Sequence, residues 1–406
     1  MTPPPASLII VSRHRPAALM RALAGVAQMD HPEFEVIVVA DPAGVAAAQG
    51  LGMALKLTVF DEPNISAARN IGLGLASAPV VAFLDDDAVP EPSWLSRLAT
   101  PFSDERVNAA GGFVLGRSGL AWQWRAVWVD NDGFDHPFDA SAGISLHAGT
   151  PKRAIKTQGT NCAFRRDALL SIGGFDEGFS FYLDEADVNL RLAALGGLTA
   201  VVPDAVVHHG FAASQRRRAD RVPTDLTQIG HSLALFRARH GGAANALPCH
   251  IAGQRARLIR HMVSGALEPR DVGALMGSLE QGIAGGQKAA ATWTAALPIA
   301  PSQAPFAPLG NTAPRGGCLL FGTTKDRALL TEQAREARAN GQIVTMILLS
   351  RGLRAHSHRF TANGWWEQTG GRFGRSFRNG PRYDWQAAAD RRLIEAARLA
   401  RFRPVQ

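Results

Sequence analysis

The first 115 residues alternate between short apolar runs and helical patterns, and this alternation restricts the fold more than any other feature. We expect strands at the runs 7–12, 35–40, 56–60 and 80–84. Helices are expected at 16–29, which opens on a proline, and at 66–76, which follows Asn64 as a suitable N-cap. Such alternation is typical of a mostly parallel sheet with helices on both faces. The sequence therefore predicts an α/β fold of Rossmann-like type.

The rest of the chain predicts additional parts, since 406 residues exceed an ordinary domain. We expect a main domain at 1–240, a helical extension at 241–290, a linker rich in proline, alanine and glycine at 291–317, and a small α/β accessory unit at 318–406. Within the main domain, residues 117–158 hold Trp122, Trp124 and Trp128 and look like an irregular insertion near a binding face.

Targeting and redox signals are few. No run of about 18 apolar residues predicts a membrane-spanning helix, and residues 1–7 lack the pattern of a secretory signal. Three widely spaced cysteines predict neither a disulfide framework nor a zinc site. We therefore expect a cytoplasmic protein.

Three adjacent aspartates, Asp85, Asp86 and Asp87, follow the buried run 80–84 and give the strongest chemical signal. Adjacent carboxylates repel each other and resist burial unless a cation neutralises them. Their oxygens suit Mg²⁺ or Mn²⁺, and residues two apart at a strand end face the same side. An acidic turn after a strand is the simpler alternative, but the surrounding pattern favours a metal site formed by Asp85 and Asp87.

A second acidic group, Asp184, Glu185 and Asp187, opens a predicted helix at 184–195. Asp184 could be its N-cap, and Asp187 stands four residues before Arg191, the spacing of an ion pair. One of these carboxylates could instead act as the general base that deprotonates an incoming hydroxyl. Capping and catalysis are compatible, so both interpretations stay open.

Two neighbouring histidines, His208 and His209, end the apolar run 199–207. A neutral imidazole could complete the metal shell beside the aspartates, although a surface histidine pair is an equal alternative. The basic stretch 214–218 that follows could fold over phosphates, or form a basic surface loop.

Taken in order, these motifs resemble glycosyltransferase family 2, the large inverting family with the GT-A fold. The resemblance covers roughly residues 6–240. It rests on the stretches NISAARNIG (64–72), VAFLDDDAVPEPSWL (81–95), GTNCAFRR (159–166) and GGFDE (173–177).

By this resemblance Asp85 and Asp87 would hold the metal, and Asp86 would face the donor ribose or sugar. His209 is the candidate for a further metal ligand from the histidine pair. The implied nucleotide contacts are Ser12, Arg15, Asp41 and Arg69. The family usually carries Glu-Asp where this chain has Asp184-Glu185. Position matching makes Glu185 the base, with Asp184 as its competitor. The family's second strand often ends with an aspartate where Ala40 stands, one residue before Asp41.

The function that follows is an inverting glycosyltransferase. It would move a sugar from a nucleotide-diphosphate sugar to a hydroxyl of a glycan, lipid-linked or other acceptor, in surface polysaccharide or glycoconjugate synthesis. A catalytically inactive adaptor is the alternative, and it should have lost one of the acidic groups. A nucleotidyltransferase should show a glycine-rich loop after the first strand, which Arg13-His14-Arg15-Pro16 lacks.

The end of the chain is strongly basic, with 12 arginines against four acidic residues from Arg351 onward. Such a segment could contact nucleic acid, anionic lipid or a phosphorylated acceptor. The accessory unit at 318–406 as a whole could serve an acceptor, an anionic membrane surface at the inner face of the membrane, or self-association. A solvated basic surface is the plainer alternative. We expect no nucleic-acid partner.

Overall fold

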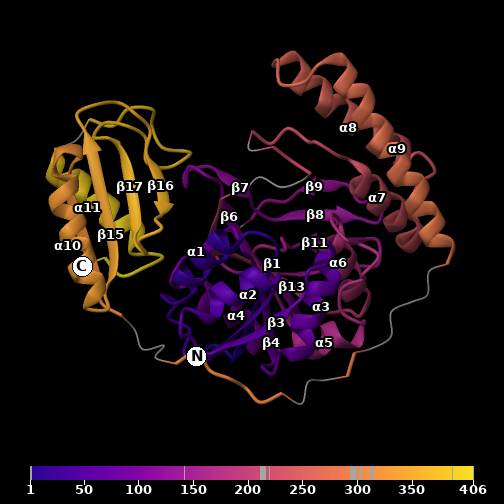
Figure 1. The fold of residues 1–406 in the computed structure, drawn as a ribbon, viewed down its shortest axis with the longest axis horizontal. Helices are drawn as coiled ribbons and strands as arrows, with labels where there is room; N and C mark the ends of the chain where they lie inside the picture. Colours follow the sequence, from indigo (N-terminus) through magenta and orange to yellow (C-terminus); the bar gives the residue numbers. More distant parts are fainter. Residues whose placement is uncertain are drawn as a thin grey trace.

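A computed structural model of the protein describes residues 2–140, 142–210, 216–218, 220–292, 299–300, 304–310, 315–385 and 387–405. Its central feature is a large mixed sheet with helices on both faces (Figure 1). The strands of this sheet are Ala6–Ser12 (β1), Phe34–Ala40 (β2), Leu55–Val59 (β3), Val80–Asp85 (β4), Ala88–Pro90 (β5), Val107–Leu115 (β6), Trp122–Trp124 (β7), Ser145–Ala148 (β10), Cys162–Arg165 (β12) and Leu198–His209 (β13).

The sheet is mostly parallel, as the sequence predicts. Its main path runs β10-β13-β6-β12-β4-β1-β2-β3, with β5 paired to β13 and β7 to β6. The pairs β1–β2, β1–β4, β2–β3 and β6–β13 are parallel. β12 runs antiparallel between β4 and β6, and β10 is antiparallel to β13. The ends of β4 and β13 therefore meet at one edge, where β5 joins them.

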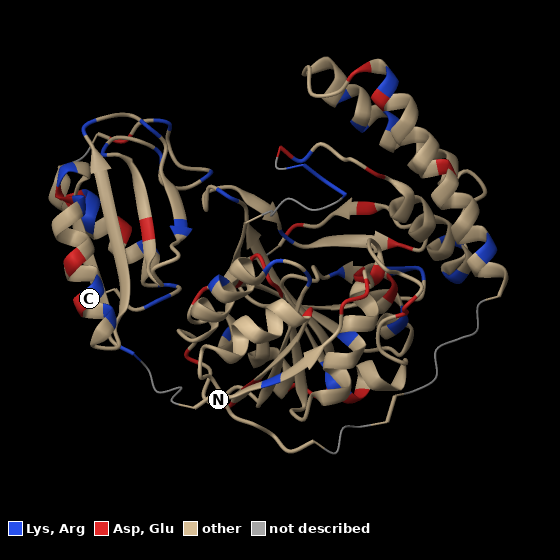
Figure 2. Ribbon diagram, in the orientation of Figure 1, with Lys and Arg blue, Asp and Glu red and all other residues tan. Residues whose placement is uncertain are grey.

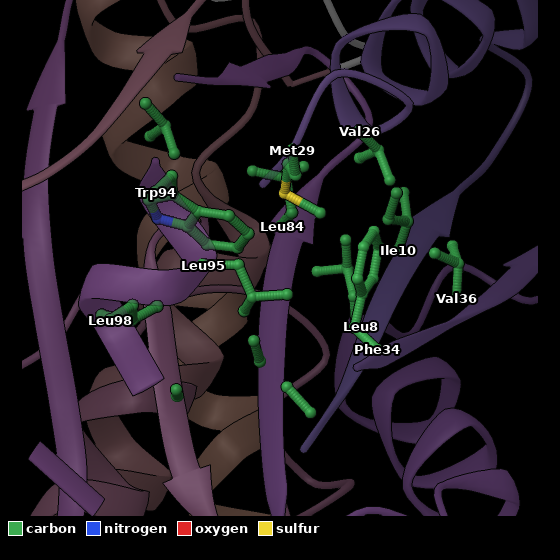
Figure 3. Close-up of a cluster of buried hydrophobic side chains, with 14 of the residues drawn as sticks. Leu8, Ile10, Val26, Met29, Phe34, Val36, Leu84, Trp94, Leu95 and Leu98 are labelled. Atoms are coloured by element: carbon green, nitrogen blue, oxygen red, sulfur yellow. The ribbon is translucent and has the colours of Figure 1, made fainter. Parts of the chain in front are cut away.

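Alternating side chains of the central strands supply a core on each face, which is why both faces carry helices. Leu8 and Ile10 pack toward Pro16–Val26 (α1) and Trp94–Ala99 (α4) (Figure 3). Ile9, between them, packs on the other face toward Ile65–Leu75 (α3) and Asp184–Ala194 (α6). Two shorter helices complete the main part: Pro42–Gln49 (α2) and Arg166–Ser171 (α5).

Residues 117–158 are more regular than predicted. Besides β7 and β10, they form a small antiparallel sheet in the order β11-β8-β9. Its strands are Val127–Asp130 (β8), Asp135–Pro137 (β9) and Arg153–Lys156 (β11). The prediction of an irregular insertion is therefore wrong, because these strands are only three or four residues long and carry little periodic signal.

Three helices follow the main sheet: Thr227–His240 (α7), Ala246–Val263 (α8) and Pro269–Ala291 (α9). They share one apolar cluster with residues of α6 and β8. Within the described ranges, no helix is both long enough and apolar enough to cross a bilayer.

The described residues from 317 to 405 form what we call the C-terminal unit. It contains a four-stranded sheet in the order β14-β15-β17-β16, with helices packed against it (Figure 1). Its elements are Gly317–Thr323 (β14), Arg327–Ala339 (α10), Ile343–Ser350 (β15), Ser357–Phe360 (β16), Trp366–Gly371 (β17) and Ala388–Leu399 (α11). Short 3-10 turns occur at Thr100–Ser103 and Thr324–Asp326.

Candidate active site

The acidic end of β4 lies directly against the histidine end of β13. β5 joins them, because its Ala88 is paired with His209 across the sheet. This pairing places His209 Nε2 2.9 Å from Asp87 Oδ1 and 3.9 Å from Asp85 Oδ2. One ligand atom from each of these three residues lies within 4.8 Å of the others. Two distant chain segments thus form a compact group of two carboxylates and an imidazole.

This group fits a hard divalent cation. Burial raises the pKa of Asp85, since two carboxylates are held close together out of water. Burial alone would lower the pKa of His209, but its hydrogen bond to Asp87 and the nearby carboxylate charges raise it. His209 Nδ1 lies 2.9 Å from Gln123 Oε1, so the Nδ1 hydrogen can be donated there. Nε2 then faces the carboxylates, as in histidines that bind metals.

His208 is directed elsewhere. Its Nε2 lies 2.8 Å from Glu91 Oε1, within a buried contact behind the acidic group. The structure therefore brings His209, rather than His208, to Asp85 and Asp87.

Two of the predicted nucleotide-side residues, Ser12 and Arg15, contact Asp86. Its side chain is fully buried and accepts a hydrogen bond from Ser12 Oγ at 2.7 Å, and it pairs with Arg15 Nη2 at 2.7 Å. Burial raises the pKa of Asp86 to about 7, although Arg15 and Ser12 oppose this shift. Arg15 also approaches Asp87 Oδ2 at 3.7 Å, which connects this group to the aspartates next to it.

Asp41 lies apart from that group. It is the N-cap of α2, accepting a hydrogen bond from the Ala43 amide at 3.2 Å, and it also accepts one from the His14 amide at 2.8 Å. The second contact holds His14 with a positive φ of 57°. The observed role of Asp41 is therefore to shape the loop after β1.

Arg69 connects the two acidic groups predicted from the sequence. Its guanidinium is buried and ion-pairs with Asp184, while Nη1 lies 3.7 Å from Glu185 Oε1 and Nη2 lies 3.7 Å from Asp85 Oδ1. Burial opposes the charge of Arg69, but the three carboxylates raise its pKa. The start of α6 and the end of β4 thus share one cation.

Asp184 and Glu185 differ in environment. Burial and the charge of Glu185 raise the pKa of Asp184 well above its ordinary value, and its side chain is only 4% exposed. The side chain of Glu185 is 19% exposed, and it accepts a hydrogen bond from the Gly159 amide at 2.9 Å.

The N-cap expected at Asp184 is displaced by one residue. Leu183 occupies that position with a left-handed φ of 66°, and Asp184 is the first helical residue. Its carboxylate turns to Arg69 instead of to the helix amides, because the buried guanidinium is the stronger partner. The predicted ion pair between Asp187 and Arg191 is confirmed at 2.5 Å.

The sequence analysis assigns no role to three neighbours of the site. Gln123 stands between two tryptophans, Gly159 acts through its backbone amide, and Glu91 is far from the histidines in sequence. Residues 214 and 215 of the predicted basic lid lie outside the described residues. Arg217, within the described part, interacts electrostatically with Asp87.

Comparison with known proteins identifies the main domain. The family model described as glycosyltransferase like family 2 matches residues 3–221, more than half of the chain. This chain belongs to glycosyltransferase family 2. Together with the mostly parallel sheet, family membership confirms the predicted GT-A fold.

Curated relatives share part of this region. The O-antigen biosynthesis protein RfbC of Myxococcus xanthus is 31% identical over 236 residues, which cover 54% of this chain and 18% of that protein. A glucosyl-dolichyl phosphate glucuronosyltransferase of Haloferax volcanii is 30% identical over 28% of this chain and 34% of its own. The succinoglycan biosynthesis protein ExoM of Rhizobium meliloti is 28% identical over 49% of this chain and 64% of its own. The chain therefore matches less than two thirds of each of these relatives.

Among solved structures, GalNAc-T7 with UDP, GalNAc and Mn²⁺ gives a TM-score of 0.45 at 14% identity, covering 61% of this chain and 53% of its own. The mannosyltransferase PcManGT of Pyrobaculum calidifontis, in complex with GDP-Man and Mn²⁺, gives a TM-score of 0.37 at 17% identity. The match covers 83% of this chain and 81% of that chain.

Proposed function

We propose that this family 2 chain is an inverting glycosyltransferase that moves a sugar from a nucleotide-diphosphate sugar to an acceptor hydroxyl. The observation that supports this best is the position of Arg69. Its guanidinium lies 3.7 Å from both Asp85, in the candidate metal group, and Glu185, the candidate base. Arg69 thus holds two sites at fixed relative positions: the metal site that would bind the diphosphate, and the carboxylate that would accept the proton. A single displacement requires this arrangement.

The donor would bind at the ends of β1 and β4. Asp85, Asp87 and His209 would hold Mg²⁺ or Mn²⁺, which when bound neutralises charge that develops on the leaving diphosphate. Asp86, fixed by Ser12 and Arg15, would face the donor ribose or sugar.

Glu185 is the better candidate for the base that takes the acceptor proton. Asp184 is committed to Arg69 and is almost completely buried, whereas Glu185 keeps a more exposed carboxylate next to the same site. The Gly159 amide holds one Glu185 oxygen and orients the other. Attack by the hydroxyl from the side opposite the diphosphate would invert the anomeric centre.

The names of the relatives support an acceptor class. Two of them are named for O-antigen and succinoglycan biosynthesis, and a third for a dolichyl phosphate. We therefore propose a glycan or lipid-linked acceptor in surface polysaccharide or glycoconjugate synthesis.

A lipid-linked acceptor would require access to a membrane, and the C-terminal unit offers a suitable surface. We call it the arginine–aromatic surface. Its exposed members are Arg351, Leu353, Arg354, Phe377, Arg378, Arg382, Tyr383 and Trp385. Two loops that pair through backbone hydrogen bonds, from Gly371 to Arg354 and from His356 to Arg375, bring most of these side chains together.

The chemistry of this surface favours an anionic membrane over other partners. Trp385 is 73% exposed, and its ring lies against the ring of Phe373. Figure 2 shows basic residues in blue on the loops of the C-terminal unit. Exposed tryptophan and tyrosine favour the membrane–water interface, while arginines attract anionic headgroups. We propose that the chain works in the cytoplasm, in peripheral contact with the inner face of the membrane.

Release of nucleoside diphosphate tests the proposed activity. A panel of nucleotide sugars should include one that releases its diphosphate when Mn²⁺ is present and stops when the metal is chelated. Asp87→Ala and Glu185→Gln should each lower this rate by about 10²-fold or more. Glu280→Gln, an exposed carboxylate on α9, serves as the matched control and should leave the rate unchanged.

The alternative, an inactive adaptor, predicts a different result from the same assay. No nucleotide sugar would turn over, and the arginine–aromatic surface would still bind its partner. Equal rates in wild type, Asp87→Ala and Glu185→Gln would also contradict the proposed roles of these residues.

A further inference from the structure

The C-terminal unit contacts the main domain close to the candidate metal site. The His358 amide donates a hydrogen bond of 2.8 Å to the Ser118 carbonyl, just after β6. Near the end of the chain, Ser93 Oγ donates to the Phe402 carbonyl at 2.9 Å. The first contact joins β16 to the loop after β6, and the second holds the last residues of the chain against the segment that follows β5.

Arg403 enters the main domain at this place. Its side chain is 2% exposed and its Nη1 lies 2.9 Å from Glu91 Oε2. The other oxygen of Glu91 faces His208 Nε2 at 2.8 Å. Trp366 of β17 contacts both partners of Glu91, since the Arg403 guanidinium lies 4.1 Å from the centre of its ring and the His208 ring lies 4.9 Å away.

This contact lies immediately behind the candidate metal ligands. Glu91 follows β5 directly, and β5 begins one residue after Asp87. Across the sheet, Val89 is paired with His208 and Ala88 with His209. Glu91 therefore holds the same short strand pair that brings His209 to Asp87.

A buried carboxylate at this position needs its partner. Burial would raise the pKa of Glu91, but the charge of Arg403 and the hydrogen bond from His208 lower it. Removal of one partner from a buried ion pair leaves an uncompensated charge, and the local structure must rearrange to hydrate it. Here such a rearrangement would move β5 and the end of β13, which carry Asp87 and His209.

We propose that Arg403 is a positioning residue for the metal site: it fixes Glu91 and His208, and through them the strand pair that presents Asp87 and His209. The inference rests on the proposed function of the Asp85–Asp87–His209 group. It goes beyond that function, because Arg403 lies outside the region, residues 3–221, that the family model matches. The C-terminal unit would thus be part of the working active site rather than an independent attachment.

The chain provides a matched control for this proposal. Arg401, two residues before Arg403, also ties the end of the chain to the main domain, through Asp204 at 2.7 Å. That ion pair is on the surface, with both side chains well exposed. Arg401→Met therefore removes a cation and an interdomain contact without touching Glu91.

The test measures binding of Mn²⁺ alone to the full chain by electron paramagnetic resonance, which does not depend on turnover. Arg403→Met should weaken Mn²⁺ affinity about 10-fold or more, as for other residues that orient metal ligands. Arg401→Met should stay within about twofold of wild type, and Arg403→Lys should recover part of the loss because it restores the charge.

A double variant keeps the test valid if Arg403→Met does not fold. Glu91→Gln combined with Arg403→Met removes both charges of the pair, and it should still lose part of the Mn²⁺ affinity because the contact from Arg403 to residue 91 that anchors the strand pair is absent. The inference is overturned if Arg403→Met and the double variant both bind Mn²⁺ as tightly as Arg401→Met.

Failure of the proposed metal site would look different. Wild type would then not bind Mn²⁺, or would bind it equally well after Asp87→Ala. That result would overturn the metal site and this inference together, whereas unaltered Mn²⁺ binding in the Arg403 variants would overturn the inference alone.

Discussion

Arg69 is the residue on which the candidate site most depends. It is buried beneath the rings of Phe83 and Phe175, with its guanidinium carbon 5.8 and 5.1 Å from their centres. Its partners are the carboxylates of Asp184, Glu185 and Asp85. The aromatic rings exclude water from the guanidinium, so these carboxylates are its main compensation.

Replacement of Arg69 by methionine should therefore destabilise the fold. Asp184 would remain buried without its cation, and a broken buried ion pair costs about 3–5 kcal/mol. Urea denaturation of Arg69→Met should show this loss. Asp184→Asn in the same chain should restore part of the stability, because the buried charge is then removed. A loss below about 1 kcal/mol in the single variant would contradict the importance given to this pair.

His31 should make the stability of the fold depend on pH. It is fully buried, its Nε2 lies 3.1 Å from the Pro4 carbonyl, and burial lowers its pKa to about 4. The unfolded chain takes up a proton near pH 6.5 while the folded chain does not, so stability should fall as pH drops from 6.5 toward 4. The full effect would be about 3 kcal/mol.

Comparison of wild type with His31→Gln measures this contribution. Urea unfolding at pH 7 and pH 5 should show a smaller loss of stability in the variant, since glutamine keeps a donor for Pro4 and does not titrate. Equal losses in the two proteins would mean that His31 is not responsible.

At the scale of elements, the sequence predicts the central strands well and the short ones poorly. β1, β2 and β4 consist mostly of apolar residues, as expected for strands buried on both faces. α2 was not predicted, because its eight residues are mostly alanine and glycine and have little apolar periodicity. The three-residue strands β5 and β7 depend on pairing with β13 and β6, which a local pattern cannot show.

The site follows the same rule. The proximity of Asp85, Asp87 and His209 could be predicted because each stands at the end of a predicted strand, and such ends meet at one edge of the sheet. The N-cap expected at Asp184 was displaced because a buried cation from α3 competes for its side chain. Glu91 and Gln123 could not be predicted, since their importance comes only from the pairing of β5 and β7.

Close packing of α7 on α9 gives a prediction at the same scale. A Cβ added to Gly282 would lie 1.9 Å from the Thr227 carbonyl oxygen, so the helices must separate to admit it. Gly282→Ala should therefore destabilise the protein by about 1–3 kcal/mol. Gly277→Ala is the matched control, because nothing lies within 4 Å of its added Cβ.

Thermal unfolding distinguishes the two variants. Gly277→Ala should raise the melting temperature, since alanine in a helix interior is favoured over glycine by about 0.5–1 kcal/mol. Gly282→Ala should lower it. Melting temperatures that shift in the same direction would contradict the tight contact between α7 and α9.

At the scale of the whole molecule, the arginine–aromatic surface makes a prediction about membranes. Each arginine near an anionic bilayer contributes about 1 kcal/mol, so Arg378→Gln combined with Arg382→Gln should weaken binding to phosphatidylserine vesicles about 10-fold or more. Trp385→Ala should weaken it further, and binding should fall as salt is raised. Vesicle sedimentation measures all of these effects.

Neutral phosphatidylcholine vesicles and Arg270→Gln are the controls. Arg270 is 87% exposed on α9, outside the arginine–aromatic surface, and its replacement should leave vesicle binding unchanged. Equal binding of all variants to anionic vesicles would contradict the membrane role. If the protein bound single-stranded RNA tightly and did not bind anionic vesicles, this surface would belong to another partner.

The proposed activity requires that three distant parts of the chain, the ends of β4 and β13 and the start of α6, form one metal-dependent site. Crystals grown with Mn²⁺ and a nucleoside diphosphate would test it most directly, because the anomalous signal of manganese locates the ion. We expect one ion bonded to Asp85, Asp87 and His209, with the diphosphate beside it and Glu185 across the donor site. An ion bound elsewhere, with His209 still hydrogen-bonded to Asp87 and bound to no metal, would contradict the proposed site.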